Sequence, residues 1–215
     1  METSSIAKQH PESADQDPVR QRIVRAAFSV FMERGYAETN TLEIATRAKV
    51  SKRELYALVG NKQEMLAACI RERAQRLGRP EETPLVQDRK SLARVLESFG
   101  SRLLREVSDP TVVAVFRLAI AEAERTPKVA RALDTIGRET TRAALREILT
   151  QARSAGLLEG DSSEMAEQFG GLLWGDLMVS LLLRVADAPN PREIKRRARN
   201  ATAAFLLLYP RPVKP

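Results

Sequence analysis

Apolar residues recur at intervals of three to four positions along most of the chain, which is the period of amphipathic helices. Several helix starts are marked by a capping residue followed directly by proline, at Asp17-Pro18, Asp109-Pro110, Thr126-Pro127 and Asn190-Pro191. The alternation in steps of two that marks a half-buried strand is not found. The sequence therefore predicts an all-α fold.

Residues 39–62, TNTLEIATRAKVSKRELYALVGNK, hold two short helical patterns joined by a tight turn. Asn40 with Glu43, and Ser51 with Glu54, have the spacing of capping boxes. In such a box the capping side chain accepts from the third helical N–H, while the acid reaches back to the cap. Two helices that start eleven residues apart, with a short turn between them, indicate a helix-turn-helix.

The second of these helices is predicted to present a basic surface. Apolar residues near the turn are expected to form a small cluster, and others give the second helix a buried side: Leu42, Ile44, Ala45, Ala48 and Val50, then Leu55, Leu58 and Val59. Lys52, Arg53, Tyr56 and Ala57 would then face outward. A short helix of this kind has the dimensions to enter a DNA major groove.

The flanking segments support the same organisation. A helix over 18–34, stopped by Gly35, packs its apolar face on the helix-turn-helix and turns Arg20, Arg22, Arg25 and Arg34 outward, either to solvent or to phosphate. Another helix starts at Gly60-Asn61-Lys62 and runs to about Gly78. Its first N–H groups lie beside Lys62 and predict a phosphate site. Residues 1–16 are polar and aperiodic, and are predicted to be a disordered tail or, alternatively, a minor-groove arm.

Two prolines in 79–87 mark a boundary, so we expect a DNA-binding domain over 17–79 and a helical second domain over 86–210. Capping residues and glycines predict the helices of the second domain, with a bend near Gly137 in the third: 88–107, 109–125, 126–155, 161–185 and 190–208.

Composition narrows the class of protein. The 215 residues carry 35 Lys+Arg and 28 Asp+Glu, a net charge of +7, and residues 20–62 alone hold nine basic against four acidic side chains. The excess favours an anionic partner for this segment. Cys69, interpreted as a small buried residue, and His10 are the only cysteine and histidine, which excludes an internal disulfide and a Cys/His zinc site.

The same composition argues against a membrane protein and against an enzyme. The longest apolar run, 172–183, is broken by Asp176 and is too short to span a bilayer, so we expect a cytoplasmic protein without a membrane segment. Neither a nucleophile beside a base, nor a metal cluster, nor a Gly-rich phosphate loop is found. No cofactor is expected.

Residues 20–70 resemble the DNA-binding domain of TetR-family bacterial regulators, through the runs IVRAAFSVFMERGYAETNTLEIATRAKVS and SKRELYALVGNKQEML. The resemblance implies phosphate contacts by Thr39 or Asn40, Tyr56 and Lys62, and base contacts by Lys52, Arg53 and Tyr56. With the cap residue, the candidate DNA-binding set is Thr39, Asn40, Ser51, Lys52, Arg53, Tyr56 and Lys62.

Three positions depart from the family pattern. Lys49 replaces a common turn Gly, and a left-handed lysine costs about 1 kcal/mol, so either the turn differs or the domain tolerates the strain. Val59 stands where Phe is frequent, and Glu54 stands where Thr is frequent. The Glu54 carboxylate either accepts from a cytosine amino group or is taken up by the cap at Ser51.

The segment 115–183 is similar to the regulatory domain of the AefR-like branch of this family, through FRLAIAEAERTPKVARAL, EILTQARSAGLL and AEQFGGLLWGDLM. The resemblance implies a unit that binds a small-molecule effector and dimerises through its last two helices. Small residues and the terminal apolar face are the dimer-interface candidates: Ala166, Gly170, Gly171, Gly175, Ala198, Ala201, Phe205 and Tyr209.

An effector pocket is expected among the central helices, where most apolar residues are core. Its candidate lining is Phe99, Leu103, Phe116, Ile120, Phe169, Leu173, Trp174 and Met178. Arg117, Glu122 and Glu124 are polar residues on an apolar helix and serve either surface pairing, as in Glu122 with Arg125, or ligand recognition.

The sequence thus predicts a homodimeric repressor that leaves a near-palindromic double-stranded DNA operator when a small molecule binds. The alternatives are an activator or an effector-independent DNA-binding regulator, and, less favoured, an all-helical enzyme.

Overall fold

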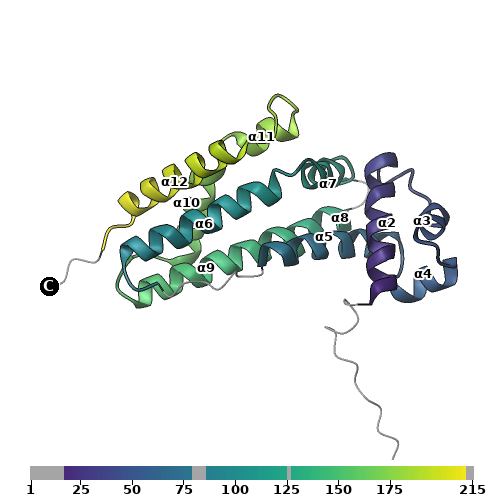
Figure 1. Ribbon diagram of the computed structural model, residues 1–215, viewed down its shortest axis with the longest axis horizontal. Helices are drawn as coiled ribbons and strands as arrows, with labels where there is room; N and C mark the ends of the chain where they lie inside the picture. Colours follow the sequence, from purple (N-terminus) through teal and green to yellow (C-terminus); the bar gives the residue numbers. More distant parts are fainter. Residues whose placement is uncertain (1–16, 79–85, 125–126, 212–215) are drawn as a thin grey trace, which may run out of the picture. The chain divides into compact units, whose positions relative to one another are not determined.

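The computed structural model describes residues 17–78, 86–124 and 127–211, apart from the side chains of 73–78 (Figure 1). Every regular element in these ranges is helical, which confirms the all-α prediction. The chain divides into two compact units, residues 1–70 and 71–215. The division falls inside a helix, earlier than the proline-containing boundary expected from the sequence. In the parts of the chain that the structure describes, no helix has both the length and the apolar character needed to span a membrane.

The first unit contains α2 (Pro18–Arg34), α3 (Thr41–Ala48), α4 (Lys52–Leu58) and the start of α5 (Lys62–Gly78). The start of α2 was predicted correctly: Asp17 accepts from Val19 N at 2.8 Å, and Pro18 occupies the first turn. Its buried face packs on α3 and includes Ile23 and Phe31. Cys69 is buried and donates to Val24 O, which confirms its interpretation as a core residue.

The second unit contains seven α-helices in its described parts, together with one π-helical turn, η1 (Leu133–Arg138). The α-helices are α6 (Arg89–Val107), α7 (Pro110–Ala121), α8 (Pro127–Ala132), α9 (Glu139–Ser154), α10 (Ser162–Trp174), α11 (Leu177–Leu182) and α12 (Pro191–Leu208). The most extensive packing is between α6 and α12, and α10 packs on both α9 and α12 (Figure 1). Leu96, Phe169 and Phe205 lie at the centre of this core.

Two predicted helices of this unit are interrupted. The bend expected near Gly137 falls in the π-helical turn that separates α8 from α9. The helix predicted over 161–185 is instead two helices, because Gly175 adopts φ +49° and ψ −125° and ends α10. A third predicted helix, α7, is shorter than expected. It ends at Ala121, whereas the sequence predicted an end at Arg125, which lies outside the described ranges.

Two arginines hold the ends of helices in place. Arg117 on α7 donates its Nε to Leu182 O at 3.0 Å and its guanidinium also to Leu181 O, so it closes the C-terminus of α11. Arg117 was expected to serve surface pairing or a ligand, and the structure gives it this third role. Arg89 on α6 donates to carbonyls at the end of α12 and beyond α9: Leu206, Tyr209 and Leu157.

Burial corrects part of the dimer-interface prediction. Ala166, Ala198, Ala201 and Phe205 belong to the core of their own unit, because the apolar face of α12 is covered by α6 and α10. Tyr209 is half-buried against the same core, and Gly170 is half-buried. Gly171 and Gly175 are exposed, and a Cβ at either would meet nothing within 4 Å.

The predicted pocket residues also separate by burial. Phe99, Leu103, Phe169 and Leu173 are buried in the core, and Phe116, Trp174 and Met178 are partly buried against it. Ile120 is 60% exposed, so it does not line an enclosed pocket in its own unit. Glu122 is buried at the end of α7, and its expected partner Arg125 lies outside the described residues.

Candidate nucleic-acid interface

Helix α4 is a short helix with one anchored side and one open side. Ser51 Oγ accepts from Glu54 N at 3.1 Å, as predicted for the cap. Leu55 is fully buried and Val59 nearly so, and these two residues fix the helix to the unit. Lys52, Arg53, Tyr56 and Ala57 are exposed, which confirms the predicted outward face.

The turn between α3 and α4 is tight because Lys49 is left-handed. Its φ is 53° and its ψ is 49°, and its N–H donates to Thr46 O at 3.1 Å. Val50 N donates to Ala45 O at 3.0 Å, which closes the turn. The domain therefore tolerates a left-handed lysine where glycine would be unstrained, at a cost of about 1 kcal/mol.

Tyr56 is held in position by α3. Its hydroxyl lies 3.1 Å from Thr41 Oγ1, and Lys52 Nζ lies 5.9 Å from the centre of its ring. The ring itself is 42% exposed. The hydrogen bond to Thr41 was not foreseen, because the sequence pattern does not show which residues of two helices meet across a turn.

The predicted contacts at the start of α3 need correction. Thr39 is 5% exposed, and its hydroxyl donates to Gly35 O at 2.6 Å, so its side chain is not available to DNA. Asn40 is exposed and caps α3, but Asn40 Oδ1 accepts from Leu42 N rather than from the third helical N–H. The acid of that expected capping box, Glu43, instead lies near arginines 34 and 47.

Leu42 is the main surface residue that sequence reasoning missed. It was expected in the apolar cluster at the turn, but it is 56% exposed at the second position of α3. The residue follows Thr41, which contacts the exposed Tyr56 of α4. Helical periodicity gave no signal for its exposure, because Leu42 fits the apolar spacing of its neighbours.

An ion pair between Arg47 of α3 and Glu33 of α2 joins the two helices. Both guanidinium nitrogens of Arg47 bind the Glu33 carboxylate, at 2.5 and 2.8 Å, and Ser29 Oγ donates to the same carboxylate at 2.9 Å. The hydrogen bond from Arg47, followed by the one from Ser29, lowers the pKa of Glu33 to about 2. Arg47 is therefore committed to the protein itself.

The remaining cations of this unit fall into two groups. Arg22 Nε donates to Ala48 O at 2.7 Å and ties α2 to the end of α3. The side chains of Arg25, Lys49 and Arg53 have no hydrogen bond or ion pair within the described residues of the chain. Positive charge without an internal partner is therefore present on the turn and on α4, where an anionic ligand could neutralise it.

Lys62 is more engaged than the resemblance implies. Lys62 Nζ donates to Ala37 O at 2.9 Å and to Thr39 O at 3.0 Å, and it lies 4.7 Å from the centre of the Tyr36 ring. These contacts tie the start of α5 to the loop before α3. A phosphate contact by Lys62 stays a prediction. The neighbouring cap is built as expected, with Asn61 Oδ1 accepting from Glu64 N and Glu64 accepting from Asn61 N.

A capped, cationic second helix that follows a tight turn and has its polar side exposed is the arrangement of a DNA-binding helix-turn-helix. Residues 23–69 match the bacterial regulatory proteins of the TetR family, and residues 94–211 match the C-terminal domain of the AefR-like transcriptional repressors. The chain belongs to the TetR family. This family is a non-enzymatic class of regulators, and the described residues hold no group of three or more His, Cys, Asp or Glu that could bind a metal.

Individual relatives extend over nearly the whole chain. The uncharacterized helix-turn-helix regulator YvkB of Bacillus subtilis (strain 168) is 23% identical over 191 residues, which cover 88% of this chain and 96% of YvkB. The crystal structure of a TetR transcriptional regulator from Agrobacterium tumefaciens is similar, with 30% sequence identity and a TM-score of 0.78. The match covers 91% of this chain and 96% of the Agrobacterium chain. The flavonoid-responsive regulator FrrA is 29% identical, with a TM-score of 0.75. The match covers 91% of this chain and 98% of the FrrA chain.

The Glu33–Arg47 pair predicts a pH dependence of stability. Because folding lowers the pKa of Glu33, its stabilising effect is fully present above the unfolded pKa near 4.5 and is lost as the pH falls through about 2. The Glu33→Gln variant should therefore have a lower melting temperature than the wild type at pH 7. This difference in melting temperature should disappear as the pH falls from 4.5 to 2. Thermal unfolding followed by circular dichroism measures this difference.

The matched control is Glu38→Gln, which removes an exposed carboxylate that has no ion pair or hydrogen bond within the described ranges. This variant should have the same melting temperature as the wild type at every pH. A Glu33→Gln difference that stayed constant down to pH 2 would show that the carboxylate is not paired in solution.

Proposed function

We propose that this protein is a homodimeric repressor whose two α4 helices read a near-palindromic operator and whose second unit releases the DNA when a small molecule binds. The observation that carries the DNA-binding part is the cationic, exposed face of α4, with Lys52 and Arg53 beside a tyrosine fixed by α3. Family membership supports the same function. An activator, or a regulator without effector, is the alternative.

In this proposal the exposed residues of α4 have different tasks. Arg53 donates two hydrogen bonds to a guanine edge, because its guanidinium has no partner in the described chain and is free to do so. Lys52 and the Tyr56 hydroxyl contact a base edge or phosphate. The exposed Leu42 side chain packs on a thymine methyl group, which is the one apolar feature of the major-groove edge.

The proposed dimer uses the outward side of the last helices. Large apolar side chains are exposed around the α10–α11 break and at the end of α12: Leu172, Val179, Leu183, Val185, Leu207 and Leu208. Large exposed apolar side chains of this kind are frequent at protein interfaces. The exposed Gly171 and Gly175 add a side without Cβ atoms, where a second helix can approach closely.

The proposed effector is a small, largely apolar molecule. A relative that is 29% identical over almost the full chain is flavonoid-responsive. In this chain Phe116, Trp174 and Met178 lie partly buried at the edge of the core near the break at Gly175, where a planar molecule could insert. A hundredfold release of DNA requires about 2.7 kcal/mol of coupling between the two sites.

Selection of bound duplexes from random-sequence DNA tests the DNA-binding part of the proposal. We expect enrichment of two inverted half-sites whose centres lie about 34–36 Å apart, one helical turn. Recovery of single half-sites, or of no preferred sequence, would contradict a dimer that reads a palindrome.

Arg53→Ala should relax the base preference at one or two positions of each half-site, by roughly 1–3 kcal/mol. The measurement compares binding to the selected operator with binding to each single base-pair substitution, at fixed salt. Arg25→Ala removes a similar exposed charge from α2 and should leave the relative preferences unchanged. Full retention of specificity by Arg53→Ala would assign base reading to another residue.

Val179→Glu combined with Leu183→Glu should convert the dimer into monomers at micromolar concentration, because each carboxylate would be buried without a partner. Sedimentation equilibrium gives the mass. Ile120→Glu places the same charge at an exposed apolar position of α7 and should remain dimeric. A dimeric Val179/Leu183 variant would place the interface elsewhere.

Flavonoids should lower the affinity for the selected operator, and Trp174→Ala should weaken this response at least tenfold without changing the affinity for DNA in the absence of ligand. Fluorescence anisotropy of labelled operator measures both quantities. An operator affinity that no flavonoid changes would favour another effector class or the effector-independent alternative, while leaving the selected operator valid.

A further inference from the structure

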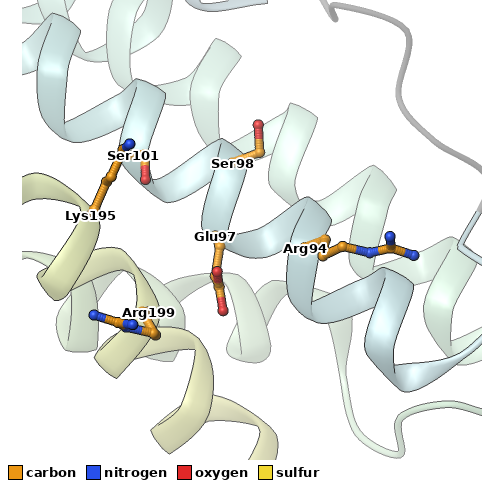
Figure 2. A pocket seen from close by; sticks show the side chains of 6 residues that line it. All are labelled: Arg94, Glu97, Ser98, Ser101, Lys195 and Arg199. Carbon is orange, nitrogen blue, oxygen red and sulfur yellow. The ribbon is translucent and has the colours of Figure 1, made fainter.

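A polar groove of about 380 Å³ lies between α6 and α12 in the second unit (Figure 2). It is distinct from the apolar core candidates discussed above, because its lining is entirely charged or hydroxylated. Four residues come from α6 and two from α12: Arg94, Glu97, Ser98 and Ser101, with Lys195 and Arg199. Its volume lies within the range of small-molecule sites, roughly 300–1,000 Å³.

The packing of two antiparallel helices places these side chains together. Arg89, at the start of α6, donates to carbonyls of Leu206 and Tyr209 at the end of α12, which sets the antiparallel direction. Gly100 faces Ala198, since a Cβ at Gly100 would lie 3.5 Å from the Ala198 Cβ. On either side of this close approach, Ser101 faces Lys195, and Glu97 faces Arg199 (Figure 2).

The three cations of the groove have no internal partner. Arg94, Lys195 and Arg199 form no hydrogen bond or ion pair with any part of the chain that the structure describes. Only a longer-range attraction links Arg94 to a carboxylate, that of Asp88. Lys195 and Arg199 lie across the groove from Ser101 and Glu97, whereas the Arg94 guanidinium at the end of the groove points away from them (Figure 2).

Neighbouring arginines on the same helix behave differently. Arg196 donates to both oxygens of Glu193, at 2.7 and 2.8 Å, and Arg197 donates to the same carboxylate at 2.8 Å. The hydrogen bond from Arg196 is the largest cause of the lowered pKa of Glu193. Arg196 and Arg197 are therefore neutralised by Glu193, whereas the side chains of Lys195 and Arg199 have no such partner in the described chain. The groove thus carries an excess of positive charge.

We propose that this groove binds a small phosphorylated hydroxy compound, such as a sugar phosphate or a nucleotide. Lys195 and Arg199 bind the phosphate oxygens, and the hydroxyl of Ser101, which lies beside Lys195, donates to the same group (Figure 2). Glu97 accepts from a hydroxyl of the ligand, which a bare phosphate would lack. The site belongs to the second unit alone and does not depend on the proposed release of DNA by an apolar effector.

Isothermal titration of the full-length protein with ribose 5-phosphate, inorganic pyrophosphate and ribose tests the proposal at constant ionic strength. Ribose 5-phosphate should bind with a Kd below ~1 mM, and ribose should not bind measurably. Lys195→Ala with Arg199→Ala should weaken the binding of ribose 5-phosphate at least tenfold. Both side chains are exposed, and circular dichroism checks that the helical fold is kept.

The charge-matched control is Lys128→Ala with Arg131→Ala, two exposed cations of α8 that do not line the groove. It should bind ribose 5-phosphate as the wild type does. Equal weakening in both double variants would show a general charge effect and overturn the site, as would binding that is absent in the wild type. Glu97→Gln should strengthen pyrophosphate binding relative to ribose 5-phosphate, and an unchanged ratio would remove Glu97 from the site.

Operator binding by the groove variant separates a small anion from DNA as the occupant. A DNA affinity equal to that of the Lys128/Arg131 control supports the small-molecule site. A loss of DNA affinity in the Lys195/Arg199 variant alone, without any binding of ribose 5-phosphate to the wild type, would assign the groove to DNA backbone instead.

Discussion

The geometry of the DNA-binding unit depends on the turn at Lys49. A left-handed residue at this point ends α3, and α4 begins three residues later with its polar side exposed. Lysine pays a steric cost there that glycine would not. The surrounding contacts hold the turn in place: Val50 N donates to Ala45 O inside the turn, Arg22 holds Ala48 O from α2, and Thr41 contacts Tyr56 across the turn.

Charge in this unit serves two purposes that are separated in space. Arg47 and Glu33 form a two-pronged ion pair that joins α3 to α2, and Lys62 joins the start of α5 to carbonyls before α3. These cations support the fold and are partly neutralised by it. Arg53 and Lys49 have no such partner in the described chain, so the field they create extends into solvent. A net charge of +7 alone would not distinguish these two groups.

The second unit combines a firmly packed helix pair with interrupted helices around it. The α6–α12 pair makes the most extensive helix contact of the unit, and Arg89 fastens one end of it. In contrast, α10 and α11 are divided at Gly175, and α8 and α9 are divided by a π-helical turn. Interruptions of this kind leave backbone groups that a modest rearrangement can pair differently. Helix α5 begins in the first unit and ends in the second, so it is the covalent element shared by the two.

The sequence determined where the main helices start, because a helix start depends on residues that are adjacent in the chain. Asp17-Pro18, Ser51, Asp88, Asp161 and Asn190 all cap helices, since a short acceptor beside free N–H groups needs no distant partner. The same local reading gave the outward face of α4, whereas it left open whether Lys49 would be left-handed. The resemblance to the family followed from consecutive residues in this segment.

Only the tertiary structure decided which helix faces are covered. Periodicity groups Ala198, Ala201 and Phe205 on one side of α12, but it does not say whether that side meets a second subunit or α6, and the answer is α6. Leu42 fits an apolar pattern and is exposed, whereas Thr39 is polar and buried. The cover over α12 comes from a helix distant in sequence, and Thr39 is held by its bond to Gly35 O in the loop before α3. A helical period carries no information about what lies opposite a face.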